Sequence, residues 1–153
     1  MAEKNLYTRR LKCLQNLIKK NFESSDFIQA HPEMTTTKGF IIGYINWAKK
    51  EGRPVYQKDI ERDYSISRST ASEFLDSLEQ DGIIMRVVDQ NDQRKKQLFC
   101  TEKGEELMFE LHQTLNDVNI KMLEGFTEEE TKTFEILLER MILNLKKGDG
   151  NND

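Results

Sequence analysis

The chain has 153 residues, of which 37 % are hydrophobic and 33 % are charged, and its formal net charge is −4. These values fit one soluble, helix-rich domain with a modest core. No segment is long and apolar enough to cross a membrane, so we expect a cytoplasmic protein with no membrane partner. Cys13 and Cys100 lack metal-type spacing, which agrees with a reducing compartment and argues against a disulfide framework.

Apolar residues at helical spacing predict a first helix over about residues 5–22. The spacing aligns Tyr7, Leu11, Leu14, Ile18 and Phe22 on one side of that helix. This stripe requires a partner surface. Residues 24–37 are rich in Ser and Thr and contain a His-Pro pair, which indicates a connection with a short turn of helix around Phe27 and Ile28.

A second helix is predicted over residues 38–50, and Gly52-Arg53-Pro54 should end it. The side chains expected to face inward are Phe40, Ile41, Tyr44, Ile45 and either Trp47 or Ala48. Residues 53–56 are a candidate for a short strand that pairs with the hairpin predicted further along the chain.

Residues 57–82 have the pattern of two helices joined by a tight turn. Ile60 and Tyr64 share one face of a short helix over 57–64, and Ile66 in the turn points into the core. Ser67 is placed to cap a second helix, and Gly82 should terminate it. The buried stripe of this helix is predicted to be Ala71, Phe74, Leu75 and Leu78.

The other face of this second helix begins with short or hydrogen-bonding side chains: Arg68, Ser69, Thr70, Ser72 and Glu73. Residues of this kind at a helix N-terminus are typical of a recognition helix, whose first turns reach base edges in the major groove of DNA. A purely structural helix would more often carry Glu/Lys pairs on this face.

Residues 83–88 are β-prone, residues 89–96 are turn-rich, and residues 97–100 can return as a second strand. The predicted hairpin therefore ends in a cationic tip formed by Arg94, Lys95 and Lys96. Adjacent cations suit a loop that lies against phosphates or in a narrow minor groove. A solvated charge run is the alternative interpretation, and the preceding helix-turn-helix makes it less favoured.

A long helix is expected over about residues 102–124, with Leu107, Leu111, Leu115, Val118 and Met122 on its apolar face. Thr127 and Glu130 form a capping-box pattern that begins a last helix. That helix should be lined by Phe134, Leu137, Leu138, Met141, Ile142 and Leu145. Residues 148–153, GDGNND, are expected to be a disordered tail.

The chain resembles the MarR family of bacterial winged-helix transcriptional regulators over nearly its whole length. The resemblance rests on ISRSTASEFLDSLEQDGII, on Asp92-x-Arg94, and on the sequence TEKG at residues 101–104. It implies a mainly α fold, a winged helix-turn-helix with flanking N- and C-terminal dimerisation helices. The single domain would cover residues 1–147, with dimerisation helices at 5–22 and 102–146 and a DNA-binding lobe at 53–100.

The resemblance also implies residue roles. Arg94 would enter the minor groove and Asp92 would brace it, while the early residues of the recognition helix would lie in the major groove. The chain departs from the family pattern at three places: Ile60-Glu61 replaces a frequent Leu-Ala pair, Ser65 occupies a common glycine position, and Cys100 replaces an aliphatic residue. The first two departures weaken the match to a generic helix-turn-helix, but neither removes a DNA-contacting group.

By the same resemblance, the protein would be a sequence-specific regulator, most often a repressor, that binds a palindromic operator in double-stranded DNA as a homodimer. A small aromatic or phenolic effector would release it. Tyr7, Phe40, Tyr44 and Trp47 could line the effector pocket, although ordinary core positions are the more frequent role of such rings. Some relatives sense peroxides through a first-helix cysteine, but the polar context of Cys13 favours simple packing.

Two other classes of function are weighed against DNA binding. Residues 53–100 carry 8 basic and 9 acidic side chains and residues 101–153 carry 6 and 13, which keeps open a winged helix used for protein association. Catalysis is not expected, because His31 and His112 are isolated and no nucleophile or phosphate-binding motif is present. No cofactor and no metal are expected.

Overall fold

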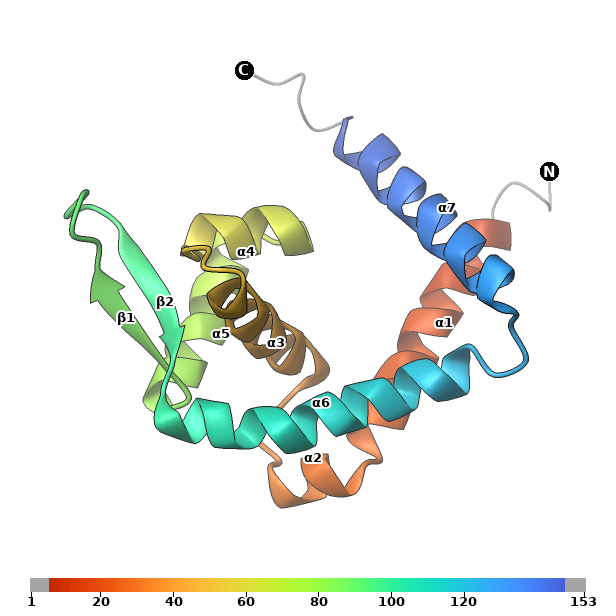
Figure 1. Cartoon of the computed structure of the whole chain (residues 1–153), viewed down its shortest axis with the longest axis horizontal. Coiled ribbons are helices and arrows are strands. Elements are labelled where there is room, and N and C mark those ends of the chain that lie inside the picture. Colours follow the sequence, from red (N-terminus) through yellow and green to blue (C-terminus); the bar gives the residue numbers. More distant parts are fainter. Residues whose placement is uncertain (1–5, 148–153) are drawn as a thin grey trace. The chain divides into compact units, whose positions relative to one another are not determined.

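The computed structural model describes residues 6–147, so the tail predicted at 148–153 lies outside the described residues. Its helices and strands follow the predicted order (Figure 1): α1 Leu6–Glu23, α2 Asp26–Ala30, α3 Thr36–Lys50, α4 Gln57–Tyr64, α5 Arg68–Gln80, β1 Ile84–Val88, β2 Lys96–Cys100, α6 Glu102–Met122 and α7 Glu128–Lys146. The mainly helical winged fold is thus confirmed. Within the described residues, no helix is long and apolar enough to span a membrane.

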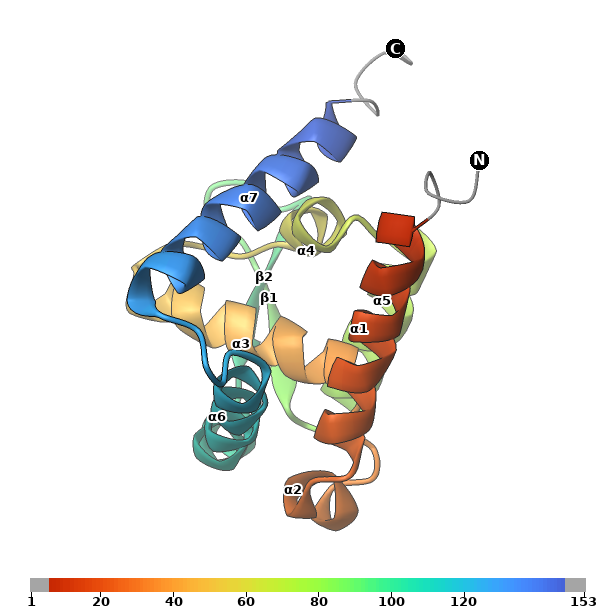
Figure 2. The same cartoon turned by 90° about the vertical axis from the view of Figure 1, so that its right-hand side faces the viewer.

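The chain divides into two compact units, one ending at Val118 and one beginning at Asn119. The core of the first unit forms around α3, which buries Ile41, Ile42, Ile45 and Ala48. Figure 2 shows α1 and α2 beside the amino-terminal end of α3, where the Phe22 ring packs against Gly39. The helices α4, α5 and α6 contribute Ile60, Leu75, Leu78 and Leu111, all fully buried.

The prediction that Phe40 faces inward is wrong within the single chain, because aliphatic residues occupy the inward face of α3 and the Phe40 side chain is 39 % exposed. Of the two alternatives Trp47 and Ala48, Ala48 is the buried residue, and Trp47 is 46 % exposed. In α1 only Phe22 is buried, whereas Tyr7 is 76 % exposed and Leu11 44 % exposed. The helix predicted at residues 5–22 is therefore present as α1, but of its predicted apolar stripe only Phe22 is buried.

The hairpin is a two-stranded antiparallel sheet in which Ile84 pairs with Cys100 and Val88 with Lys96. The short strand predicted at residues 53–56 is present as a single bridge between Tyr56 and Gln97. Next to it, the Leu98 amide donates to the Val55 carbonyl at 2.8 Å. These bonds tie the hairpin to the start of α4, so the wing is anchored at its base.

The second unit contains α7, whose N-terminus has the predicted capping box. The Glu130 amide donates to the Thr127 hydroxyl at 3.2 Å, and the Thr127 amide donates to the Glu130 carboxylate at 2.8 Å. None of the described α7 side chains is buried. Its exposed apolar residues are Ile136, Leu137, Met141, Ile142, Leu143 and Leu145.

Candidate nucleic-acid interface

The turn between α4 and α5 sets the direction in which α5 leaves the core. Ser65 adopts a left-handed conformation with φ +50°, the only positive φ of a non-glycine residue within the described part of the chain. The Ile66 amide then donates to the Glu61 carbonyl at 3.1 Å, and the Ile66 side chain packs against the core. This turn starts α5 with its first residues exposed.

The first turn of α5 is held by a cluster of hydroxyl groups. Ser67 caps the helix as predicted, because its Oγ accepts from the Thr70 amide at 3.2 Å. The Ser67 Oγ also lies 3.0 Å from the Ser69 Oγ and 2.9 Å from the Thr70 Oγ1. Either partner can donate in these two bonds, so Ser69 and Thr70 can each present a donor or an acceptor to a ligand.

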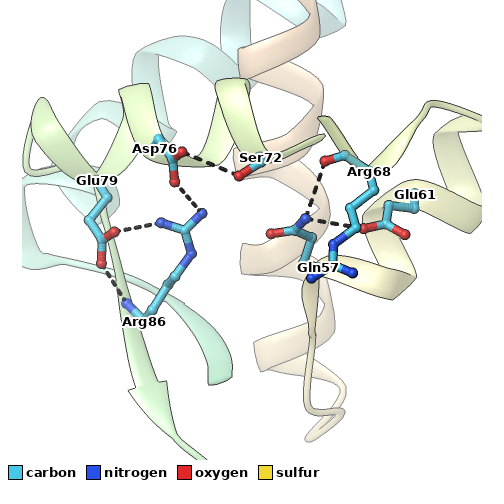
Figure 3. Close-up of polar contacts among 7 residues, drawn as sticks. All are labelled: Gln57, Glu61, Arg68, Ser72, Asp76, Glu79 and Arg86. Atoms are coloured by element: carbon cyan, nitrogen blue, oxygen red, sulfur yellow. Dashed lines mark hydrogen bonds and ion pairs between the residues drawn. The ribbon is translucent and has the colours of Figure 1, made fainter. Parts of the chain in front are cut away.

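The α4 helix supports α5 through Gln57, a residue that the sequence analysis did not single out. Its amide group donates to the Glu61 carboxylate at 3.1 Å and to the Arg68 carbonyl at 3.3 Å (Figure 3). The Arg68 side chain remains exposed, as does that of Glu73. The side-chain amide of Gln57 therefore fixes the backbone of Arg68, the first residue of α5.

A second set of contacts joins α5 to β1 (Figure 3). The Ser72 hydroxyl donates to Asp76 at 3.2 Å, and Asp76 accepts from the Arg86 guanidinium at 2.7 Å. Glu79 accepts from both the guanidinium and the backbone amide of Arg86. The Arg86 side chain is only 14 % exposed.

Sequence reasoning missed this network, although a signal for it existed. Arg86 lies two residues after the buried Ile84, and alternation along a strand places both side chains on the same face. A partly buried cation needs a partner, and Asp76 and Glu79 present two carboxylates one helical turn apart. The partners lie ten and seven residues away, so they were not visible in a local motif.

The wing tip brings Asp92 and Arg94 together. The Arg94 guanidinium donates to the two Asp92 oxygens at 3.1 and 3.3 Å, and the Arg94 amide donates to Asp92 at 3.1 Å. The Arg94 side chain is nevertheless 89 % exposed. The guanidinium is thus held in position while most of its surface stays available. Lys95 and Lys96 are also exposed, and the Lys95 ammonium lies 5.8 Å from the centre of the Tyr56 ring.

Asp89 organises the loop that carries these cations. It accepts from the amides of Asn91 at 2.7 Å and Asp92 at 3.0 Å, and the Tyr56 hydroxyl also donates to it. The Tyr56 hydrogen bond, followed by the Asn91 amide, holds the pKa of Asp89 below its ordinary value. The Arg94 guanidinium similarly lowers the pKa of Asp92. Both carboxylates therefore remain charged at neutral pH.

The residues proposed for an effector pocket are only partly brought together. The rings of Tyr44 and Trp47 have centroids 5.9 Å apart, and the Tyr64 ring lies 6.2 Å from Tyr44. Tyr64 donates to the Phe40 carbonyl at 2.8 Å, and burial raises the pKa of Tyr64 to about 12. The exposed Trp47 ring contacts the Arg53 guanidinium, whose carbon lies 5.2 Å from the ring centroid.

The two cysteines occupy different environments. Cys13 is exposed, so the expectation that it packs as a small hydrophobic residue is wrong within the single chain. Cys100 is buried, and burial raises the pKa of its thiol to about 11. Within residues 6–147, no three His, Cys, Asp or Glu side chains are grouped so that they could hold a metal ion.

Comparison with known proteins places this geometry in a family. The MarR family profile matches residues 50–96. A regulator from Bacillus subtilis strain 168, the uncharacterised HTH-type transcriptional regulator YybA, is 30 % identical over 115 residues, which are 75 % of each chain. The chain therefore belongs to the MarR family of transcriptional regulators.

Solved structures agree with the fold. The transcription regulator MarR from Oenococcus oeni PSU-1 superposes with a TM-score of 0.74 and 29 % identity, covering 89 % of this chain and 98 % of its own. The S. aureus MepR–DNA complex superposes with a TM-score of 0.80 and 21 % identity, covering 94 % of this chain and 99 % of the MepR chain.

Proposed function

We propose that this protein binds an operator in double-stranded DNA sequence-specifically, with α5 in the major groove and the wing in the minor groove. The observation that carries the proposal is the wing tip, where Asp92 fixes an arginine whose side chain is still 89 % exposed. Pre-ordering a cation in this way lowers the cost of placing it in a groove of strongly negative potential. The structurally similar MepR was solved in complex with DNA, which supports DNA as the partner of this fold.

In this proposal, the side chains of the DNA-binding surface have distinct roles. Arg68, Ser69, Thr70, Ser72 and Glu73 lie along the first turns of α5 and would face base edges or adjacent phosphates. Arg94, Lys95 and Lys96 would contact the minor groove and the sugar-phosphate backbone, with Asp92 as the brace of Arg94. Operator binding requires access to the chromosome, so the proposal places the protein in the cytoplasm.

We further propose that the protein acts as a homodimer on a palindrome and represses transcription until a small aromatic or phenolic effector shifts it to a form that releases DNA. The exposed apolar residues of α1 and α7 support the dimer, since such surface is costly in water. The Tyr44, Trp47 and Tyr64 rings support an aromatic ligand, for which Tyr7 and Phe40 remain candidates.

The test compares Arg94→Ala with Arg140→Ala, an equal change of charge in α7. Arg94→Ala should weaken binding to operator DNA and reduce the slope of log affinity against log salt by about one for each wing that contacts DNA. Arg140→Ala should leave the slope unchanged. Binding is measured by fluorescence anisotropy over a salt series, and equal slopes for Arg94→Ala and wild type would contradict the docking.

The near-neutral charge of residues 53–100 supports one second candidate, a winged helix that binds another polypeptide. The same titration separates the two functions. A steep loss of affinity with salt is expected for DNA because bound counterions are released, whereas an interface of mixed charge need not show it. Failure of the wild-type protein to retain any promoter fragment from sheared genomic DNA would favour the protein partner.

A further inference from the structure

The inference rests on the proposed DNA binding and concerns one hydroxyl on α5. The Ser72 Oγ lies 3.2 Å from Asp76 Oδ2, on a side of α5 that is partly open to solvent. An ionised carboxylate can only accept hydrogen bonds, so Ser72 must donate its one proton to Asp76. The Ser72 oxygen can then accept a hydrogen bond from a ligand, but its single proton is not available to be donated to that ligand.

Asp76 cannot easily turn away from Ser72, because Arg86 holds its other oxygen at 2.7 Å. Arg86 is itself fixed by Glu79, which accepts from its guanidinium and from its backbone amide. This arginine is the only cation that the described contacts give to Asp76, and it is 14 % exposed. Arg86 of β1 therefore holds Asp76 in the position in which it accepts the Ser72 proton (Figure 3).

The first turn of α5 provides a contrast. Ser69 and Thr70 bond to the Ser67 hydroxyl, and in those contacts either oxygen can be the donor. Their hydroxyl protons can reorient to suit the base that they meet. Ser72 lacks that freedom as long as Asp76 is ionised and held by Arg86.

We infer that Asp76 and Arg86 are positioning residues that make Ser72 a hydrogen-bond acceptor toward DNA, so that Ser72 selects an amino-bearing base on the strand it contacts. In the major groove the amino groups are cytosine N4 and adenine N6, whereas guanine and thymine present acceptors there. Ser72 would thus discriminate cytosine and adenine from guanine and thymine. If Ser72 turned to donate to a base, Asp76 would lose a bond.

The experiment selects binding sites from a randomised DNA pool with the full-length wild-type protein, Ser72→Ala, Asp76→Asn and Glu79→Gln, and sequences the bound fractions. Ser72→Ala identifies the position that Ser72 reads. At that position the wild type should prefer cytosine or adenine by about fivefold, the equivalent of one hydrogen bond. Asp76→Asn frees the hydroxyl proton and should reduce the preference to about twofold or less.

Glu79→Gln is the matched control. It removes the same charge and one contact of Arg86, but Glu79 does not touch Ser72, so the preference should persist. The inference is overturned if Asp76→Asn keeps the wild-type preference at the Ser72 position, or if Ser72→Ala changes no position at all. Recovery of no shared motif by the wild-type protein would instead overturn the proposed DNA binding.

Discussion

At the scale of single residues, the functional surface depends on side chains whose backbone or rotamer is set by a neighbour. Ser65 turns the chain between α4 and α5 at a φ of +50°, where most L-residues are strained. The resemblance to the MarR family implies that glycine is common at this position, where this chain has Ser65. The structure supplies the reason for that glycine, which is the left-handed turn itself.

Ser65→Gly should therefore stabilise the protein. Relief of the left-handed strain exceeds the added flexibility of glycine in the unfolded chain, so the free energy of unfolding should rise by about 0.5–1 kcal/mol. Urea unfolding followed by circular dichroism measures it. Ser24→Gly, a serine at the end of α1, where no positive φ is found, is the control and should give no increase.

At the scale of elements, two glycines have opposite roles in the packing of helices. A Cβ on Gly104 of α6 would lie 2.2 Å from the Ile83 carbonyl oxygen, which is backbone and cannot easily move. A Cβ on Gly43 of α3 would meet no atom within 4 Å. Gly104 thus permits the close approach of α6 to Ile83, directly before β1, while Gly43 only weakens its helix.

Gly104→Ala should lower the free energy of unfolding by about 1–3 kcal/mol, because the backbone of Ile83 must shift. Gly43→Ala should raise it by about 0.5–1 kcal/mol, the difference in helix propensity between the two residues. Thermal and urea unfolding of both variants tests the pair. Similar effects of the two substitutions would show that the close approach at Gly104 does not matter.

The wing loop should respond to pH through Tyr56 and Asp89. Their hydrogen bond lowers the pKa of Asp89 and raises the pKa of Tyr56. Because the pKa of Asp89 is lower in the folded protein than in the unfolded chain, Asp89 stabilises the fold at pH values above its unfolded pKa. This stabilisation is lost as the pH falls through the folded pKa. Because the pKa of Tyr56 is higher in the folded protein than in the unfolded chain, Tyr56 stabilises the fold at pH values below its unfolded pKa. This stabilisation is lost as the pH rises through the folded pKa.

Tyr56→Phe should consequently destabilise the protein most at neutral pH. The difference in unfolding free energy between Tyr56→Phe and wild type should shrink in acid. It should also shrink above the pH at which an ordinary tyrosine hydroxyl ionises. Urea midpoints over a pH series measure it. A difference that does not change with pH would mean that Tyr56 acts only through packing against Lys95 and its other neighbours.

At the scale of the whole molecule, the apolar surface of the terminal helices exceeds what one chain covers. Leu145 is 78 % exposed and Ile136 is 60 % exposed, and none of the described side chains of α7 is buried. The capping box satisfies amide groups at the start of α7, so these apolar residues lie on a helix with a defined beginning. The proposed homodimer would cover this surface with a second copy of the chain.

Leu145→Glu should convert the proposed dimer to a monomer, because a charge would then be buried at the interface. Asn144→Glu places the same charge on the neighbouring residue of α7 and should leave the dimer intact. Light scattering after size-exclusion chromatography gives the mass of each. A Leu145→Glu protein that remains a dimer would exclude this part of α7 from the interface.

The sequence by itself determined the elements whose signals are local. The bounds of α4 and α5, the Ser67 cap, the Thr127 capping box and the hairpin follow from spacing and turn chemistry within a few residues. The pairing of Asp92 with Arg94 was expected from the resemblance to the MarR family, and it too joins residues that are close along the chain. These features depend on neighbours along the chain.

Only the tertiary structure decided which apolar faces are covered and which polar groups meet. It left Phe40 and Trp47 exposed, because helical spacing places several apolar residues on adjoining faces and packing selects among them. It also joined Ser72 and Asp76 to Arg86 of another element. Such contacts depend on how β1 packs against α5, and that arrangement results from burial of the whole core instead of any local motif.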